Sequence, residues 1–228
     1  MRVRRAFGFV DLVGFSNLTA REGDERAVLL AGQFRALVRE ICSRRGVRIA
    51  KWLGDGAMLV GVETSPLLGA VLELQHAATE RSLPAQVCCG ATTGSVLLLE
   101  GDDYIGHAVN VAARLCDLAQ PKEVLATTTV VGDLPPWATV LERLDVRVRG
   151  IDEALAVARL GLRPTDASAD PDPVCGICLT PQTAVALRQD SLGQPVLLCS
   201  DSCLETWEGR PAPTPEEQGS LRVPLIGS

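Results

Sequence analysis

Apolar and polar positions change their spacing several times along the first hundred residues. Residues 7–13, FGFVDLV, form an apolar run that predicts a short buried strand. Apolar residues between positions 30 and 41 recur at helical spacing, and a second helix is predicted from Pro66 onward, because proline is favoured in a first helical turn. Two apolar runs within residues 47–62 flank Gly-Asp-Gly, which predicts a tight β-hairpin.

These elements, together with β-forming residues at 87–99, follow the order strand, helix, two strands, helix, strand. This order predicts an α+β fold, an α/β sandwich whose core is a ferredoxin-like βαββαβ unit. Residues 109–118 have helical character, and β-rich stretches at 124–128 and 139–148 predict additional strands. We expect one domain over residues 1–163.

The chain changes character after this domain. Residues 164–173 have the proline- and aspartate-rich composition of a linker. Two close cysteine pairs follow within residues 174–209, and so short a segment needs a metal to fold on its own. The last residues, 210–228, contain few large apolar side chains, so we expect a flexible tail there.

Four of the eight cysteines lie scattered in apolar segments, where a buried thiol is usual. The other four form the pairs CGIC and CSDSC, separated by 20 residues. This pattern indicates a tetrahedral zinc site in a reducing compartment rather than a disulfide framework. Four thiolates would close the site, so its zinc is expected to be structural. The predicted zinc ligands are Cys175, Cys178, Cys199 and Cys203.

Negative charge is concentrated at the C-terminal end. The formal net charge is −6, and residues 164–228 account for all of it, with nine acidic and three basic side chains. Because neither part has a basic excess, nucleic acid is not expected as a partner. No apolar run reaches the roughly 18 residues of a membrane helix, and the run after the basic N-terminus is too short for a signal peptide. We expect a cytoplasmic protein without membrane contact.

Two acidic residues have mainly apolar neighbours. Asp11 lies inside the first predicted strand, where an uncompensated carboxylate is costly, and Asp55 lies at the tip of the hairpin. The turn formed by Gly14, Phe15 and Ser16 leads into a helix whose first amides are free to bind phosphate oxygens. Together these features predict a site for a metal–triphosphate. The alternative for each acid is a solvent-facing position.

Polar residues elsewhere form a second candidate group. Asn110 and Arg114 are four positions apart and share one helix face, although both residue types are also common on simple solvated faces. Lys51 is one of only two lysines in a chain with 20 arginines. A lysine four positions before Asp55 is therefore an unusual choice.

Three blocks of the chain resemble the class III nucleotide cyclases, the catalytic domain of adenylate and guanylate cyclases. They are FVDLVGFSNLT, KWLGDGAMLVG and DDYIGHAVNVAARL, they stand in the family's order, and the resemblance covers residues 7 to about 160. It implies conversion of a nucleoside triphosphate into its 3′,5′-cyclic monophosphate and pyrophosphate. In-line attack of the ribose 3′-hydroxyl on the α-phosphorus requires an activated hydroxyl and a clamp on the triphosphate charge.

The resemblance also implies a role for each candidate. Asp11 and Asp55 would hold two Mg²⁺ or Mn²⁺ ions, with the backbone carbonyl of Leu12 assisting. Arg114 is similar in position to the arginine that stabilises the transition state, and Asn110 to the asparagine that orients the ribose.

Two positions match the family less clearly. Arg149 is the candidate for a late basic residue that binds the triphosphate, with Arg147 as the alternative. Cys88 stands where many relatives have a basic residue, which is expected to affect local packing.

Lys51 and Asp103 occupy the family's two base-reading positions. Adenine offers an acceptor at N1 and a donor at its 6-amino group, and guanine reverses both. Because lysine only donates and an ionised aspartate only accepts, the pair matches ATP and mispairs with GTP. The alternative is a Lys51–Asp103 salt bridge without a ligand, which is compatible with a resting state of the same site.

In the family, each active site is completed across a dimer interface. The two acids of one subunit would face the base-reading pair and the Asn110–Arg114 pair of the other, so a two-fold homodimer would have two sites and a monomer none. The sequence thus predicts an adenylate cyclase. A catalytically silent nucleotide-binding regulatory protein is the second hypothesis, and a guanylate cyclase is the third.

The stretches DPVCGICLTP and LCSDSCLETW resemble treble-clef metal-binding modules of the YHS and TRASH type over about 35 residues. Some modules of this type are linked to metal sensing or trafficking. A metal signal or a protein partner at this module is therefore the alternative to a purely structural zinc.

Overall fold

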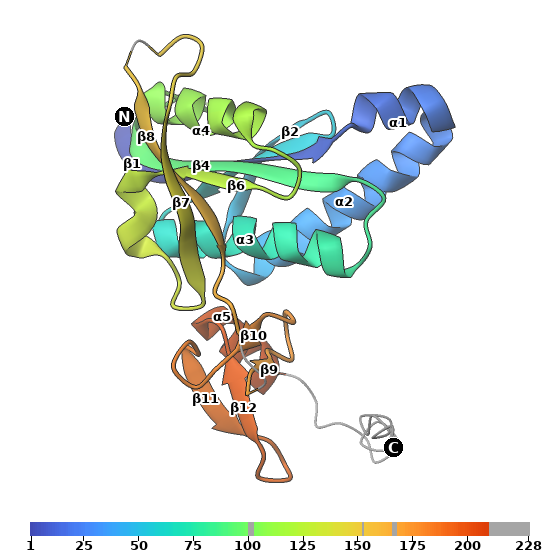
Figure 1. The fold of residues 1–228 in the computed structure, drawn as a ribbon, viewed down its shortest axis with the longest axis vertical. Helices are drawn as coiled ribbons and strands as arrows, with labels where there is room; N and C mark the ends of the chain where they lie inside the picture. Colours follow the sequence, from blue (N-terminus) through green and yellow to red (C-terminus); the bar gives the residue numbers. More distant parts are fainter. Residues whose placement is uncertain (100–102, 152, 166–167, 210–228) are drawn as a thin grey trace.

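The computed structural model describes residues 1–99, 103–151, 153–165 and 168–209. A large α+β domain carries a small cysteine-rich module at one end (Figure 1). The strands of the large domain are β1 (Arg2–Val13), β2 (Arg48–Leu53), β3 (Gly56–Gly61), β4 (Gln86–Leu98), β5 (Tyr104–Ile105), β6 (Val124–Thr127), β7 (Ala138–Val146) and β8 (Leu155–Leu162). Its helices are α1 (Phe15–Glu22), α2 (Asp24–Arg44), α3 (Thr64–Glu80) and α4 (His107–Leu118), with a 3-10 helix η2 (Thr128–Asp133).

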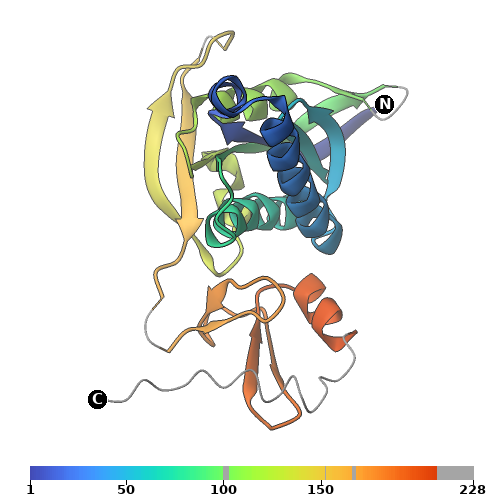
Figure 2. The same cartoon turned by 90° about the vertical axis from the view of Figure 1, so that its right-hand side faces the viewer.

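One mixed sheet forms the centre of the large domain, with strand order β2-β3-β1-β4-β6-β8-β7 and with β5 paired to β4. Helices α2 and α3 cover one face of this sheet, and α4 covers the other (Figures 1 and 2). The segment β4-β1-β3-β2 is antiparallel throughout and confirms the predicted ferredoxin-like core. The predicted additional strands are β6 and β7, and β6 joins β4 in parallel.

The helical stretch before β2 consists of two helices rather than one. Helix α1 ends at Gly23, which has a φ of 85°, and α2 starts at the next residue. Glycine adopts this left-handed conformation without the penalty of a Cβ atom. The buried face of α2 confirms the predicted helical spacing, since Leu30, Phe34, Leu37 and Ile41 are all in the core.

Strand alternation divides the side chains of β1 between the two faces of the sheet. Val10 and Leu12 belong to the core beneath α2 and α3, whereas Phe7 and Phe9 pack on the side of α4. Asp11 is in phase with Phe7 and Phe9. The fold therefore turns the carboxylate of Asp11 towards the face that α4 covers.

The predicted hairpin is formed by β2 and β3. Leu53 pairs with Gly56, which leaves Gly54 and Asp55 as a two-residue loop. Gly54 has a φ of 66°, and tight hairpin loops favour glycine for this reason. A bulge between Ile49 and Lys51 interrupts the pairing of β2 with β3.

The small module contains two short β-ribbons and one helix. Its elements are β9 (Asp170–Pro171), β10 (Cys178–Leu179), β11 (Ala186–Gln189), β12 (Pro195–Leu198) and α5 (Asp201–Glu208). The first strand thus begins inside the stretch with linker composition. Ile177 and Leu198 of the module belong to the same buried cluster as Leu67 on α3 and Trp137. The module is therefore packed onto the large domain and shares its core.

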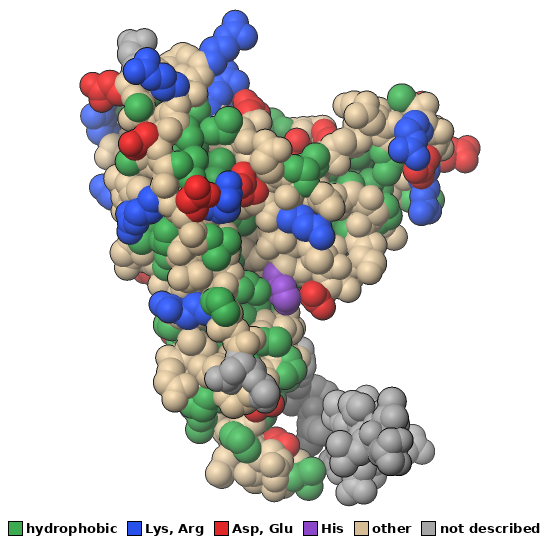
Figure 3. Space-filling view, viewed as in Figure 1, with side chains coloured by type: hydrophobic (Ala, Val, Ile, Leu, Met, Phe, Trp, Pro, Cys, Tyr) green, Lys and Arg blue, Asp and Glu red, His purple; other side chains and the backbone are tan. Residues whose placement is uncertain are grey.

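Among the described residues, no helix is both long and apolar enough to cross a bilayer. On the face seen in Figure 3, Lys and Arg side chains alternate with Asp and Glu side chains over the large domain. This distribution on that face agrees with the absence of a basic excess in the sequence.

Candidate active site and metal centre

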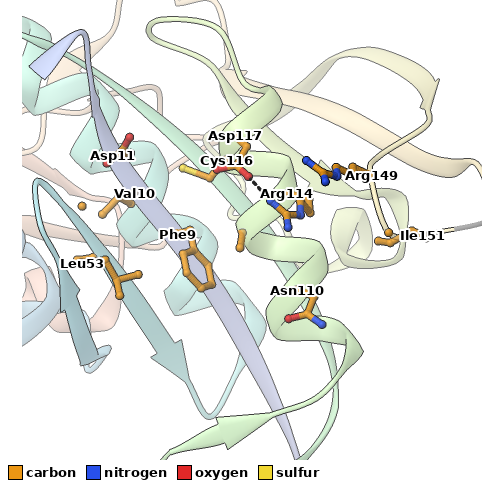
Figure 4. A pocket seen from close by; sticks show the side chains of 14 residues that line it. Phe9, Val10, Asp11, Leu53, Asn110, Arg114, Cys116, Asp117, Arg149 and Ile151 are labelled. Carbon is orange, nitrogen blue, oxygen red and sulfur yellow. Dashed lines mark hydrogen bonds and ion pairs between the residues drawn. The ribbon is translucent and has the colours of Figure 1, made fainter. Parts of the chain in front are cut away.

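A pocket of about 560 Å³ lies between β1, the start of β3 and α4. Four of the predicted site residues line it: Asp11 from β1, Asn110 and Arg114 from α4, and Arg149 from the turn that follows β7. Figure 4 shows Asp11 on one side of this pocket and the three other residues on the opposite side. The structure thus brings together residues up to 138 positions apart in the chain.

Asp11 is half-buried and lies close to the second predicted metal ligand. Burial and the negative charge of Asp55 raise the pKa of Asp11 to about 6, while a hydrogen bond from the backbone of Leu12 opposes the increase. A Cβ atom on Gly56 would lie 2.6 Å from Asp11 Oδ1, so only glycine leaves room for the carboxylate there. A half-buried carboxylate whose ionisation is disfavoured by a neighbouring carboxylate belongs to a donor set that fits Mg²⁺ or Mn²⁺.

The polar face of α4 carries an ion pair. Arg114 NH1 donates to Asp117 Oδ2 at 2.9 Å, and both side chains are about half exposed. Asp117 also lines the pocket and is a residue that the sequence analysis missed. Its position three residues after Arg114 was the available signal, because residues three apart share a helix face.

Lys51 and Asp103 form a salt bridge in the structure, with 2.8 Å between Lys51 Nζ and Asp103 Oδ1. The hydrogen bond from Lys51 lowers the pKa of Asp103, and the backbone N–H of Tyr104 donates to the same oxygen at 2.9 Å. Both side chains are exposed by more than two fifths. They are not among the described residues that line the pocket.

The remaining predicted phosphate contacts lie at turns. Gly14 caps the N-terminus of α1 with a φ of 78°, and Phe15 and Ser16 form the first turn of this helix. Of the two late arginines, Arg149 lines the pocket, whereas Arg147 is not among its described lining residues. The geometry therefore favours Arg149.

Comparison with known sequences identifies distant relatives. No family model matches the chain. An uncharacterized protein of Mycobacterium tuberculosis strain H37Rv is 33% identical over 163 residues, which are 72% of this chain and 43% of that protein. The pH-sensitive adenylate cyclase of M. tuberculosis strain CDC 1551 is 34% identical over 152 residues, 63% of this chain and 37% of the cyclase. The chain thus spans less than half the length of these relatives.

Comparison with solved structures identifies the fold. The adenylyl cyclase CyaB from P. aeruginosa matches with a TM-score of 0.64 at 20% identity, over 73% of this chain and 97% of the cyclase. The large domain has the class III cyclase fold. The guanylyl cyclase Cya2 also matches, with a TM-score of 0.60 at 18% identity over 72% of this chain and 94% of its own. The fold of this domain, called the cyclase-fold domain below, therefore does not determine whether the nucleotide carries adenine or guanine.

Three of the predicted zinc ligands converge in the module beside the cyclase-fold domain. The sulfur of Cys199 lies 3.5 Å from that of Cys175 and 3.6 Å from that of Cys203. Zinc–sulfur bonds of about 2.3 Å in a tetrahedron separate the sulfurs by roughly 3.8 Å, so this spacing suits a tetrahedral ion. The carboxylate of Asp172 joins them, and the four donor atoms lie within 4.8 Å of one another.

Cys178 departs from the predicted ligand set. Among the described residues, the converging group does not include Cys178, whose side chain is exposed on β10. Its neighbours Ile177 and Leu179 are completely buried, and strand alternation therefore turns the thiol of Cys178 outward. The fourth position of the group belongs to Asp172 instead.

Asp172 is 1% exposed, although the sequence analysis assigned it to the linker. Its Oδ1 accepts hydrogen bonds from the backbone N–H groups of Val174 and Cys175 at 2.8 and 3.3 Å. Its Oδ2 accepts one from the N–H of Cys199 at 2.7 Å. The carboxylate thus connects the two cysteine-bearing segments, and its Asp-Pro context before the first cysteine was the only signal in the sequence.

Proposed function

We propose that this chain is an adenylate cyclase, which converts ATP into 3′,5′-cyclic AMP and pyrophosphate. One observation carries the proposal: in a domain with the cyclase fold, a single pocket contains Asp11 opposite Asn110 and Arg114. Relatives that are named adenylate cyclase, including one from Glutamicibacter nicotianae at 35% identity, support this activity.

Asp11 and Asp55 would hold two Mg²⁺ or Mn²⁺ ions, with the backbone carbonyl of Leu12 assisting. When bound, such ions supply the positive charge that activates the ribose 3′-hydroxyl and neutralises the triphosphate. The raised pKa of Asp11 fits this role, because a cation removes the repulsion between the two carboxylates.

The arginines and the asparagine act on the nucleotide itself. Arg114 exchanges its half-exposed partner Asp117 for the phosphoryl oxygens on which charge develops, and a guanidinium suits this task because its N–H groups form a planar fork. Asn110, one helical turn earlier, orients the ribose. Arg149, on the same side of the pocket as Arg114, binds the polyphosphate, and the amides at Gly14, Phe15 and Ser16 add backbone donors.

Lys51 and Asp103 select the base. Lys51 donates to adenine N1, and Asp103 accepts from the 6-amino group. The two side chains must first release each other, but both are exposed, and water screens their attraction. The exchange is therefore inexpensive for ATP, whereas guanine would mispair at both contacts.

The active form is a two-fold homodimer. Lys51 and Asp103 are not among the described residues lining the pocket that contains Asp11 and Arg114. Each chain presents Asp11 and the Asn110–Arg114 pair along one pocket. In a two-fold dimer, the acids of one copy would face the base-reading pair and the Asn110–Arg114 pair of the other, which would create two equivalent sites.

The C-terminal module holds one Zn²⁺ ion through the thiolates of Cys175, Cys199 and Cys203 and the carboxylate of Asp172. The convergence of these four donors supports this ligand set. Cys178, with its exposed thiol, is not a ligand in this assignment. The ion stabilises the fold of the module and has no catalytic step to perform.

The experiment is to incubate the purified chain with ATP or GTP in the presence of Mn²⁺ or Mg²⁺ and to measure cyclic AMP and cyclic GMP. We expect cyclic AMP from ATP. Lys51→Glu should reduce this turnover by about 10- to 100-fold, since a hydrogen bond from a charged donor is lost. The matched control is Lys122→Glu, which changes the other lysine of the chain.

Three results would contradict the proposal. Absence of cyclic AMP with either metal would favour a catalytically silent nucleotide-binding protein. A preference for GTP would identify a guanylate cyclase. Equal effects of the two lysine substitutions would remove Lys51 from the base-reading role.

A further inference from the structure

Each polar atom of Cys199 has a hydrogen-bond partner, and the cyclase-fold domain supplies a partner for its carbonyl oxygen and one for its sulfur. Its N–H donates to Asp172 within the module at 2.7 Å. Its carbonyl oxygen accepts a hydrogen bond from Trp137 Nε1 at 2.9 Å, and its sulfur accepts one from Arg45 at 3.2 Å. Cys199 is 1% exposed, so none of these contacts is replaced by bulk water.

Arg45 lies at the C-terminal end of α2 and reaches the module from there. Its Nε donates to Glu73 Oε2 at 2.5 Å, and its terminal nitrogen donates to the sulfur of Cys199. The guanidinium also lies 5.4 Å from the centre of the Trp137 ring. With a side chain only 3% exposed, one planar cation bridges a carboxylate of the cyclase-fold domain and a thiol of the module.

Arg44, Arg45 and Glu73 meet Cys199 at the boundary between the domains, which we call the seam. At the seam, the buried side chains of the cyclase-fold domain carry more positive than negative charge. Arg44 and Arg45 both pair with the single carboxylate of Glu73, and all three side chains are at least nine-tenths buried. Arg44 also lies 3.7 Å from Glu40, but Glu40 is already engaged by Arg81 through two hydrogen bonds of 2.8 Å. A buried excess of positive charge is costly unless an anion lies close by.

The cysteine centre of the module supplies that anion when it holds a divalent metal ion. Three thiolates and one carboxylate on a divalent ion carry two net negative charges. Hydrogen bonds to metal-bound ligands orient them and tune the metal, and removing such a bond typically lowers metal affinity by about 10- to 100-fold. The N–H donor of Arg45 at the sulfur of Cys199 has the position of such an outer-sphere bond.

We propose that the metal centre is shared between the two domains: a Zn²⁺-class ion binds the three thiolates and Asp172, and Arg45 of the cyclase-fold domain is its outer-sphere donor. The inference rests on the metal site proposed above but not on cyclase activity. Metal binding then fixes the module against the end of α2. The connection from α2 to β2 leads within six residues from Arg45 to Lys51 on β2.

A cavity of about 590 Å³ lies at the same seam. Arg44, Arg45 and Cys199 line it, together with Ser200 and Ser202. The boundary between the domains is therefore hollowed beside Arg45.

The test is amide hydrogen exchange of the full chain, reduced and freed of metal with a chelator, before and after addition of Zn²⁺. In the native protein, Zn²⁺ should slow exchange in the module and also around residues 44–47 and Trp137. Arg45→Lys keeps a positive charge for Glu73 but cannot bridge Glu73 and Cys199. In this variant Zn²⁺ should protect the module alone, and its affinity should fall by about 10- to 100-fold.

Arg81→Lys is the matched control, because Arg81 forms an exposed fork with Glu40 and does not touch Cys199. It should behave as the native protein. If Arg45→Lys fails to fold, Trp137→Phe tests the same coupling by removing the hydrogen bond to the carbonyl of Cys199 together with part of the buried indole ring. Protection confined to the module in the native protein, or full protection and native affinity in the variants, would overturn the proposal. Neither readout depends on turnover, so a cyclase-inactive chain leaves the test valid.

Discussion

The two charged regions of this molecule differ in how deeply their side chains are buried. In the candidate active site, the pairs Lys51–Asp103 and Arg114–Asp117 are exposed by between about two fifths and two thirds. At the seam with the module, Arg45 and Glu73 are exposed by 3% and 1%. Both regions pair basic with acidic side chains, yet only the pairs of the first region are exposed to bulk water.

The difference determines what each region can do. An exposed ion pair is worth about 0–1 kcal/mol, so its members are free to exchange each other for a substrate. A buried pair is costly to break, because the residue left behind keeps an uncompensated charge. Burial raises the pKa of Glu73, and the neighbouring guanidiniums of Arg45 and Arg44 oppose that increase. The first region suits ligand binding, and the second suits a fixed contact between the cyclase-fold domain and the module.

The largest expected effect tests whether the exposed pairs of the candidate active site serve the substrate, and it follows from removing Arg114. Arg114→Ala should lower cyclic AMP formation by about 10²- to 10³-fold, since a donor to the developing charge is lost. The melting temperature should hardly change, because the pair with Asp117 is exposed. Steady-state kinetics and thermal unfolding measure the two effects separately.

The same variant tests whether sites are shared. Mixing Arg114→Ala with Asp55→Ala chains creates heterodimers in which one site keeps both residues, if each site draws them from different subunits. Activity should then return to about a quarter of the native value at equal mixing. Each variant incubated alone is the control, and absence of rescue would show that Asp55 and Arg114 act within one chain.

The seam half of the comparison is tested by Glu73→Ala. This change leaves Arg44 and Arg45 buried without their carboxylate, and we expect a loss of about 3–5 kcal/mol in the free energy of unfolding. Glu40→Ala is the matched control, because Glu40 is itself more than two fifths exposed and its 2.8 Å pair is with the exposed Arg81, so its removal should cost about 0–1 kcal/mol. Chemical denaturation measures both values. Equal losses of unfolding free energy in the two variants would contradict the distinction between a fixed domain contact and a binding site.

The residues of the candidate active site could be predicted from the sequence because local patterns mark them, whereas no local pattern marks the contacts at the seam. The Gly-Asp-Gly hairpin and the helical spacing of Asn110 and Arg114 are short-range signals. Arg45 contacts Glu73 and Cys199, which are 28 and 154 positions away, and no local pattern connects them. The cysteine spacing likewise predicts a metal module but not the outward turn of Cys178.

The smallest expected effect concerns Asp11, the half-buried acid of the pocket. Burial and the charge of Asp55 raise its pKa from 3.8 to about 6. The folded chain therefore binds this proton more tightly than the unfolded chain does, and stability falls as the pH rises from about 4 to 6. Asp11→Asn removes the penalty, so the metal-free variant should melt at a higher temperature than the native chain above about pH 6 and at a similar temperature near pH 4.

Thermal unfolding across this pH range in the presence of a chelator measures the difference. Asp133→Asn is the control, since Asp133 is a carboxylate of η2 and is not among the described residues that line this pocket. Addition of Mn²⁺ should then raise the melting temperature of the native chain and not that of Asp11→Asn. A difference that is independent of pH would mean that the carboxylate of Asp11 is not destabilised by its surroundings, and the pocket would lose its resemblance to a site built to receive a cation.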